Sequence, residues 1–399
     1  MKVYLLTGES FPDGMAAVSR IKSYAQAIKD NDIEVEILIY RRTELYGRHT
    51  SNTEAFGKYN SIPFRYIPGT PKRSRFRSLR YINDKLDIIK SIKFLRRVMQ
   101  NGDVLFLYMT KSPSLMRRFI RVAHLCGAFC IQELCELPYG TSVETKKTAQ
   151  MRKKLLEQVY PLYDGIISIS DALMDLAQRY TSPKCLHIKV PIMVDYEHFA
   201  STDYSNKSDI PFIFHAGTLY QQKDGIIGMI EAFGKAKQQL KRPIKYILTG
   251  AIEESSHPAD LYRLIKEYQI EDSVEFIGYL YRDQIKDYIC KASLVISNRP
   301  RSLQDYYGFS TKLGEYLASG TAIITTNWGE AMNWLKNGEN AYIIEPDDTD
   351  ALANAIVWVL NHPEEAQHIG KMGQETCRQY FDYRNWSHPL CEFLLKLHR

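Results

Sequence analysis

Residues 307–326 read YGFSTKLGEYLASGTAIITT, and this stretch decides the fold. It predicts a loop, a short helix, a stop and a buried strand. The apolar residues that share one helical face are Leu313, Tyr316 and Leu317. Ser310 or Thr311 is suited to cap the helix, and Gly320 is suited to end it in the left-handed conformation. The β-branched run over 321–326 then predicts a strand.

Lys312 is unusual in the first turn of this helix, where the helix dipole already presents partial positive charge. Two interpretations remain open. Lys312 and Glu315 form an i,i+3 ion pair on a solvated surface. Alternatively, a phosphate occupies the helix N-terminus and Glu315 accepts hydrogen bonds from sugar hydroxyls.

The composition describes a globular protein of two domains. At 399 residues the chain is long for a single core, and its 45% apolar and 25% charged residues are typical of a soluble protein. The first residues are too short an apolar run for a signal peptide, and no run approaches the length of a membrane helix. We therefore expect a cytoplasmic protein, with at most peripheral contact at the inner face of a membrane.

Seven cysteines, an odd number, indicate free thiols in a reducing compartment. Cys126, Cys130 and Cys135 form one cluster with His124, but their spacing does not fit a zinc site. We expect buried thiols and no bound metal.

The net charge of +6 is concentrated between residues 65 and 97 and again between 146 and 154. A solvated surface is one explanation. The others are contact with an anionic membrane surface or with an anionic acceptor. We place nucleic acid below these, because no known nucleic-acid module accompanies the charge.

Strand and helix patterns alternate throughout the first half. Strands are predicted over 2–7, 33–40, 103–109, 128–132, 165–169 and 186–190, and helices over 15–29 and 82–99 and from 112 to the stop at Gly127. Residues 41–81 show weak periodicity and predict a long basic loop with one strand. The pattern indicates a doubly wound α/β domain over residues 1–195.

Residues 191–211 are polar and rich in turn formers, as in an interdomain linker. The alternation then restarts and predicts a second α/β domain over 205–380. Its strands are predicted over 212–215, 244–249, 274–277, 294–297 and 341–344, and its helices over 225–240, 261–268 and 283–290 and from 348 and 364. A last amphipathic helix, within 383–399, is expected to pack back on the first domain.

Ligands of open parallel sheets bind beyond the carboxyl ends of the strands, so the strand-to-helix loops are the places to search. The loop over 214–225 contains Gly217, which permits close backbone approach, and Lys223, which precedes a predicted helix. Lys223 and Lys312 would then converge on one anion. For Lys223 alone, a solvent-facing loop lysine remains the alternative.

Two loops of the first domain are weaker candidates. Gly14 precedes a helix and either approaches a ligand or is an ordinary turn glycine. Glu133 and Glu136 follow a strand and either bind hydroxyls and carry a proton or are solvated loop acids. His215 is expected to pack within its strand.

These motifs together resemble the retaining glycosyltransferases of family 4, also called glycosyl transferases group 1. Residues 210–233 are similar to the family's glycine-and-lysine loop, and 294–326 to its donor motif with Glu315 as the last acid. Residues 338–348 resemble the segment that follows that motif, and 191–199 the linker before it. The resemblance implies the GT-B fold: two Rossmann-like, doubly wound parallel-sheet domains that face each other across a cleft.

The resemblance also implies the roles of individual residues. Lys223 would contact the donor diphosphate, Lys312 would add charge there, and Glu315 would hold the nucleotide ribose. The residues expected to surround the donor are Gly14, Gly217, Thr218, Tyr307, Gly308, Phe309, Ser310 and Thr311. Glu133 and Glu136 would lie on the acceptor side. No cofactor and no metal are implied besides the donor itself.

Three departures from the family pattern stand out. Thr218 replaces an arginine, so one cation for the diphosphate is missing, and Lys312 would compensate. Tyr307 occupies the place of the first glutamate of the Glu-x7-Glu motif, and Asp305 is the nearest acid. The family's histidine falls near Gln132 or Glu133.

The implied function is a metal-independent hexosyltransferase that moves a sugar from a UDP- or GDP-sugar to a glycan or lipid-linked acceptor, in surface polysaccharide biosynthesis. The alternatives are an epimerase or phosphorylase of GT-B architecture, and a nucleotide-sugar-binding protein without catalysis. The expected partners are the nucleotide sugar, the acceptor and an anionic membrane surface, without nucleic acid.

Overall fold

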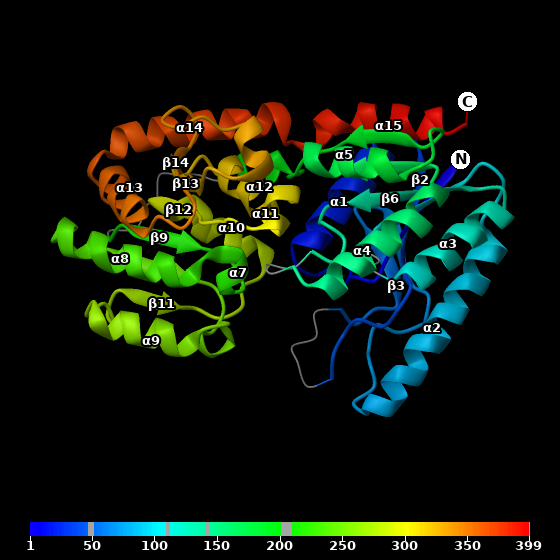
Figure 1. Cartoon of the computed structure of the whole chain (residues 1–399), viewed down its shortest axis with the longest axis horizontal. Coiled ribbons are helices and arrows are strands. Elements are labelled where there is room, and N and C mark those ends of the chain that lie inside the picture. The colour runs from blue at the N-terminus through cyan, green and yellow to red at the C-terminus, as the bar shows by residue number, and fades with distance from the viewer. Residues whose placement is uncertain (47–51, 109–111, 141–143, 201–209, 399) are drawn as a thin grey trace. The chain divides into compact units, whose positions relative to one another are not determined.

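The computed structural model describes residues 1–46, 52–108, 112–140, 144–200 and 210–398. The chain forms two compact units, shown in Figure 1. Unit 1 comprises Met1–Met193 with Tyr383–Arg399, and unit 2 comprises Val194–Asp382. Met109, predicted to end a strand, and residues 201–209 of the predicted linker lie outside the described residues.

Unit 1 contains a sheet of eight strands in the order β3-β4-β2-β1-β5-β6-β7-β8. All neighbouring strands are parallel except β3 and β4. The strands are β1 (Lys2–Thr7), β2 (Glu34–Ile39), β3 (Phe56–Tyr59), β4 (Ile62–Tyr66), β5 (Val104–Tyr108), β6 (Phe129–Leu134), β7 (Gly165–Ser168) and β8 (Leu186–Lys189). The helices are α1 (Ala16–Lys29), α2 (Arg77–Val98), α3 (Pro113–Leu125), α4 (Lys146–Gln158), α5 (Asp171–Tyr180) and α15 (Ser387–Lys396), with the 3₁₀ turns η1 (Tyr160–Leu162) and η4 (Tyr383–Trp386).

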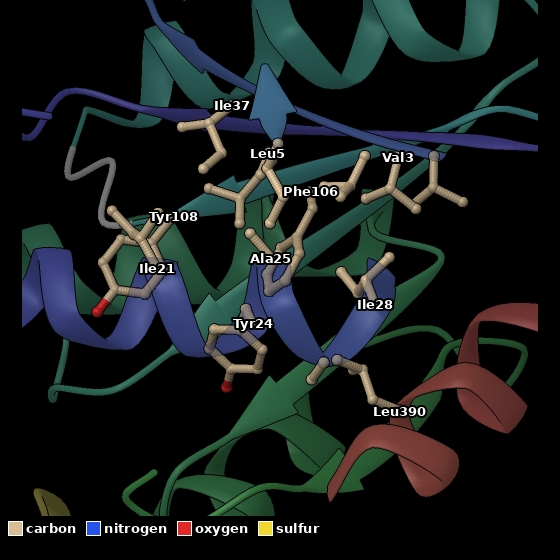
Figure 2. Packing of buried hydrophobic residues seen from close by; sticks show 14 of the residues in the cluster. Val3, Leu5, Ile21, Tyr24, Ala25, Ile28, Ile37, Phe106, Tyr108 and Leu390 are labelled. Carbon is tan, nitrogen blue, oxygen red and sulfur yellow. The ribbon is translucent and has the colours of Figure 1, made fainter. Parts of the chain in front are cut away.

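Helix α1 and the sheet form the core of unit 1. Figure 2 shows the apolar face of α1 against the buried strands; its residues there include Ile21, Ala25 and Ile28. Leu390 of α15 belongs to the same cluster, so the C-terminal helix packs on unit 1. The fully buried strand β5 is the type of strand that parallel sheets cover on both faces.

The predicted basic loop over 41–81 is wrong in two respects. Strands β3 and β4 form a hairpin there, closed by Asn60 and Ser61, which both have positive φ, as a two-residue hairpin turn requires. Helix α2 begins at Arg77, earlier than the predicted residue 82. Its buried residues are Asp87, Ser91 and Leu95, so no buried apolar residue marks the first turns of the helix in the sequence.

Unit 2 contains a parallel sheet of six strands in the order β11-β10-β9-β12-β13-β14. The strands are β9 (Phe212–His215), β10 (Lys245–Leu248), β11 (Val274–Phe276), β12 (Leu294–Ser297), β13 (Ile323–Thr326) and β14 (Tyr342–Ile344). The helices are α6 (Tyr196–Ala200), α7 (Gln221–Asp224), α8 (Ile226–Leu240), α9 (Pro258–Glu267), α10 (Arg282–Lys291), α11 (Leu303–Tyr307), α12 (Thr311–Ala318), α13 (Thr349–Asn361) and α14 (Pro363–Tyr380), with the turns η2 (Ile252–Glu254) and η3 (Gly329–Asn333).

The stretch over 307–326 folds as predicted into α12, a stop and β13. Its apolar face is buried, and Gly320 has φ +72°, in the region that favours glycine. Ser310 occupies the N-cap position without a side-chain capping hydrogen bond. The first turn of α12 therefore keeps backbone N–H groups that no capping side chain satisfies.

The structure tests two further predictions, the state of the cysteines and the absence of a membrane-spanning helix. None of the seven cysteines, all within the described residues, forms a disulfide; Cys130 is buried in β6, while Cys126 and Cys135 are half-buried. Within the described ranges, no helix is both long and apolar enough to cross a bilayer.

Gly370 of α14 lies directly against the turn that ends α12. A Cβ atom at Gly370 would lie 2.2 Å from the carbonyl oxygen of Gly320 and 3.0 Å from the amide nitrogen of Ala322. We expect Gly370→Ala to lower the free energy of unfolding by about 1–3 kcal/mol, because both neighbours are backbone and can only move apart. Thermal unfolding monitored by circular dichroism measures this effect.

The matched control is Gly228→Ala in α8, where the nearest atom to the new Cβ is the Thr349 hydroxyl oxygen at 3.3 Å. That variant should keep or raise the melting temperature, since alanine favours a helix over glycine by up to about 1 kcal/mol. A Gly370→Ala protein with the melting temperature of the wild type would contradict the close contact between α14 and the turn that ends α12.

Candidate functional site

The candidate site lies at the carboxyl edge of the unit 2 sheet. All strands of this sheet run parallel, so the loops after β9 and β12 and the N-terminus of α12 meet at one edge. Two hydrogen bonds fix the loop after β9. The amide of Ala216 donates to the hydroxyl of Tyr316 at 2.9 Å, and the amide of Gly217 donates to Thr249 Oγ1 at 2.9 Å.

Lys312 forms an ion pair with Asp224 at the centre of this edge. The Asp224 side chain is only 4% exposed, and that of Lys312 is 20% exposed. Lys312 therefore pairs across the sheet edge with the end of α7, and the alternative of a solvated Lys312–Glu315 pair is wrong. Asp224 was not among the predicted site residues, although it follows Lys223 directly in the sequence.

His215 and Arg299 complete the surroundings of Asp224. Arg299 Nη1 lies 3.9 Å from Asp224 Oδ1, and the buried ring of His215 places Nε2 3.9 Å from the same oxygen. The Nδ1–H of His215 donates to the carbonyl oxygen of Ile296 at 3.3 Å, which leaves Nε2 without a proton in the neutral ring. His215 is buried within β9, as expected.

Burial and the nearby cations shift the protonation of these groups. Burial, followed by the charge of Lys312, lowers the pKa of His215 to about 4, so the ring is neutral at physiological pH. Burial opposes ionisation of Asp224, but Lys312, His215 and Arg299 outweigh it and lower the pKa of Asp224 to about 2. Burial also lowers the pKa of Lys312 despite its pairing with Asp224.

Gly217 lies against this cluster. A Cβ atom there would lie 2.5 Å from His215 Nε2, 3.0 Å from Asp224 Oδ2 and 3.0 Å from Lys312 Nζ. Glycine is thus required by the space that the paired side chains occupy. Thr218, the next residue, is half-buried and adds no charge.

Lys223 is exposed and lies in the last turn of the short helix α7, which Gly225 separates from α8. Lys223 therefore precedes the long helix of this loop, as predicted, by three residues. Its charge contributes to the lowered pKa of Lys312, so the two ammonium groups lie within electrostatic reach of each other. The described site combines three cations, at residues 223, 299 and 312, with the carboxylates of Asp224 and Asp305.

Glu315 follows Lys312 by one turn and is half-buried. Burial raises its pKa, while the charges of Arg282 and Lys312 partly oppose this shift. A carboxylate in this setting can accept hydrogen bonds from hydroxyl groups, which would replace the water that burial removes.

The loop between α11 and α12 lines a pocket. Its lining includes Gly308, Phe309 and Ser310 together with Arg299 and Asp305. Phe309 is buried, with its ring centroid 5.6 Å from that of Phe381. Two further predicted residues flank this loop: Tyr307 is the last residue of α11, and Thr311 is the first residue of α12. The five predicted donor-binding residues over 307–311 are therefore consecutive and directly precede Lys312.

Asp305, the acid nearest to the place of the missing glutamate, is buried and already paired. Arg299 forms an ion pair with it, and the hydroxyl of Ser302 donates to Asp305 Oδ2 at 2.6 Å. These contacts compensate for the burial of the Asp305 carboxyl group. They also hold Arg299 beside Asp224.

Unit 1 contains a separate pocket at the end of β6, lined in part by Glu133 and Glu136. Glu133 belongs to the strand and is buried, so the alternative of a solvated loop acid is wrong for this residue. Glu136 is half-buried.

The reason for the burial of Glu133 is Arg20, a fully buried residue of α1 that the sequence did not single out. Arg20 Nε donates to Glu133 Oε1 at 2.7 Å, and Nη1 donates to the carbonyl oxygen of Pro191 at 2.6 Å. The Cys135 thiol also interacts with the Glu133 carboxylate, whose Oε2 meets no other hydrogen-bond partner among the residues that the structure describes. Burial raises the pKa of Glu133, against the effect of Arg20. A buried acceptor is thus available at a pocket wall.

Gly14, the remaining predicted residue, is exposed and lies just before α1. A Cβ atom there would lie 2.5 Å from Val18 Cγ2. Local packing of the helix start is therefore sufficient to require glycine.

Comparison with known proteins relates the second half of the chain to a sequence family. Residues 200–376 match the family described as Glycosyl transferases group 1. An MMP alpha-(1->4)-mannosyltransferase of Mycolicibacterium hassiacum is 26% identical over 239 residues, 59% of this chain and 54% of that protein. An N-acetyl-alpha-D-glucosaminyl L-malate synthase of Bacillus anthracis is 24% identical over 38% of this chain and 37% of that protein. The chain thus spans about half or less of the length of these relatives.

Solved structures resemble the whole chain. A sucrose-phosphate synthase of Thermosynechococcus elongatus has a TM-score of 0.73 at 16% identity and covers 100% of this chain and 99% of its own. HepE of Anabaena, in complex with UDP-glucose, has a TM-score of 0.71 at 15% identity. The match covers 99% of this chain and 100% of the HepE chain. The predicted GT-B fold is confirmed.

The neutral state of His215 makes stability depend on pH. The unfolded histidine titrates near 6.5 and the folded one at about 4, so the unfolded state binds more protons between these values. The free energy of unfolding should therefore fall as the pH is lowered from 6.5 to 4, by up to about 1.4 kcal/mol per pH unit. His215→Asn, which can still donate to Ile296, should flatten this dependence in urea denaturation. The exposed His388→Asn should retain the wild-type slope, and equal slopes for all three proteins would contradict the assignment.

The Lys312–Asp224 pair can be tested by a double-mutant cycle. Asp224→Asn leaves a largely buried ammonium without its carboxylate and should reduce the free energy of unfolding by about 3 kcal/mol. Adding Lys312→Met should restore part of that loss, because the charge that lacks a partner is removed with it. Additive effects of the two substitutions, measured by denaturant titration, would show that the side chains do not interact.

Proposed function

We propose that this chain, which belongs through residues 200–376 to the glycosyl transferases group 1, transfers a sugar from a nucleoside-diphosphate sugar to an acceptor hydroxyl. The donor is a UDP- or GDP-linked hexose. Support for a nucleotide sugar comes from HepE of Anabaena, which was solved with UDP-glucose, and from the mannosyltransferase named above.

The observation that carries this proposal is the cationic centre of unit 2. Lys312 and Arg299 are held in place by Asp224 and Asp305, and the exposed Lys223 lies within electrostatic reach. The uncapped N-terminus of α12 adds backbone N–H groups at the same edge. A diphosphate fits this combination of cations and amides, and Glu315, one turn along α12, would accept hydrogen bonds from the ribose hydroxyls.

In the proposed reaction, the bond between the sugar's anomeric carbon and the diphosphate oxygen breaks. The acceptor oxygen bonds to the same face of that carbon, so the configuration is retained, and the acceptor proton passes to the departing phosphate. Lys223 and Lys312 stabilise the negative charge that develops on the diphosphate. Because Asp224 fixes the position of Lys312 before the donor binds, little reorganisation of that ammonium group is needed in the transition state. No metal and no further cofactor enter this scheme.

The acceptor is proposed to be a glycan or a lipid-linked glycan of surface polysaccharide biosynthesis, used at the cytoplasmic face of a membrane. The pocket beside Glu133 and Glu136 is the candidate place for its hydroxyl groups. Besides the Cys135 thiol, Glu133 Oε2 meets no hydrogen-bond partner in the described structure, so it can accept a hydrogen bond from an acceptor hydroxyl.

One observation favours a second candidate function, binding of a nucleotide sugar without transfer. Tyr307 stands at the place of the first glutamate, and Asp305 is committed to Arg299 and Ser302. The sugar moiety thus lacks one acidic partner. An epimerase or phosphorylase of the same fold is a further alternative, and product analysis distinguishes all of them.

Lys223→Ala and Glu315→Ala test the donor site. We expect each to lower the transfer rate from the preferred UDP- or GDP-sugar by at least about 100-fold, because each removes a charged contact to the donor. The control is Lys291→Ala. Lys291 is exposed and ends α10 just before β12 begins, so it lies at the amino edge of the sheet, opposite to the candidate site. This variant should retain wild-type activity. A thermal-shift screen with nucleoside diphosphates and their sugars first identifies the donor, since ligand binding stabilises the folded protein.

Full activity in both alanine variants would refute the assigned donor site. Donor binding without transfer or sugar modification across an acceptor panel would indicate the binding protein. Conversion of the sugar without any acceptor would indicate an epimerase, and phosphate-dependent cleavage of a glycan would indicate a phosphorylase.

A further inference from the structure

Helix α2 presents apolar side chains to solvent. Leu79, Ile82, Leu86 and Ile89 are 46–51% exposed. Their spacing of three, four and three residues places them on one face of the helix, as a continuous stripe. Figure 1 shows α2 beside α3 at the margin of unit 1. We call these four residues the α2 stripe.

Polar contacts on the opposite face fix this orientation. Arg42 Nη2 lies 3.5 Å from the buried Asp87 carboxylate, and the Ser91 hydroxyl donates to the carbonyl oxygen of Tyr40 at 3.1 Å. Leu95 is fully buried on the same side. An amphipathic helix normally turns its apolar face to the core, so here the usual arrangement is largely reversed. The exposure of the α2 stripe is therefore built into the packing of unit 1.

Positive charge surrounds the α2 stripe. Lys93 and Arg97 continue the same face at helical spacing, and both are exposed. The further exposed cations of this segment are Arg75, Arg77, Lys85, Lys90 and Arg96. The two acids of α2 have other partners or are buried: Arg73 Nη2 donates to both carboxylate oxygens of Asp84, at 2.8 and 3.0 Å, and Asp87 is buried. The exposed face is apolar in its first half and cationic in its second.

We propose that α2 lies in the interface of an anionic lipid bilayer, with the α2 stripe among the acyl chains and the cations at the lipid phosphates. An apolar face flanked by lysine and arginine is the pattern of interfacial helices, and the long basic side chains can reach the headgroups while their stems stay apolar. Each cation near an anionic surface adds to the attraction. A second copy of this chain is a poorer occupant, because it would bring two cationic helices together.

This inference names the surface for the membrane contact and does not rest on the sugar-transfer reaction. Binding is measured without donor or acceptor. A protein that binds vesicles but transfers no sugar would refute only the proposed function, and an active enzyme without vesicle binding would refute only this inference.

Sedimentation of the full chain with vesicles tests the proposal. Vesicles of phosphatidylcholine are compared with vesicles that also contain phosphatidylglycerol. The wild type should bind the anionic vesicles, and high salt should weaken the binding by screening the charges. The double variant Ile82→Gln with Ile89→Gln should bind on the order of tenfold more weakly, because two apolar anchors are lost. Lys85→Gln with Lys93→Gln should reduce mainly the preference for anionic lipid.

The matched control is Leu125→Gln with Leu395→Gln, two exposed leucines of unit 1 outside α2, at 64% and 48% exposure. It should bind as the wild type, and all variants should share the wild-type melting temperature, because every altered side chain is exposed. Equal binding to both vesicle types, or wild-type binding by the α2 stripe variant, would overturn the proposal. So would light scattering that shows a dimer lost in that variant, since a second copy would then cover the stripe.

Discussion

The ion pair between Lys312 and Asp224 is the contact on which the candidate site depends. A lysine in the first turn of a helix is opposed by the helix dipole and, when largely buried, also by desolvation. Asp224 compensates for both from the end of α7, across the carboxyl edge of the sheet. The space needed by this pair explains Gly217, and burial together with the charge of Lys312 lowers the pKa of His215 so that its ring stays neutral.

The same pair gives the ligand-free site its electrostatic character. Two carboxylates hold Arg299 and Lys312 in fixed positions, while Lys223 stays exposed at the entrance to α8. In the proposed reaction, the diphosphate would therefore meet cations whose arrangement already exists, and Asp224 would act as the residue that positions them. This arrangement would also offset the absence of a charged residue at Thr218.

The sequence alone predicted the alternating elements, the helix and strand of residues 307–326, and the place of Lys312, because these follow from local periodicity and turn chemistry. It did not predict the partner of Lys312. Asp224 is brought there by tertiary packing, and no local pattern links positions 88 residues apart. Glu133 was misjudged for the same reason, since its partner Arg20 lies on a distant helix. The start of helix α2 was predicted too late because no buried apolar residue marks its first turns.

A crystal structure of the chain with UDP or GDP bound tests the central claim most directly. The account predicts diphosphate oxygens within hydrogen-bonding distance of the ammonium groups of Lys223 and Lys312, with the ribose hydroxyls on the carboxylate of Glu315. A nucleotide bound elsewhere in the chain, with the Lys312–Asp224 pair facing only solvent, would contradict it.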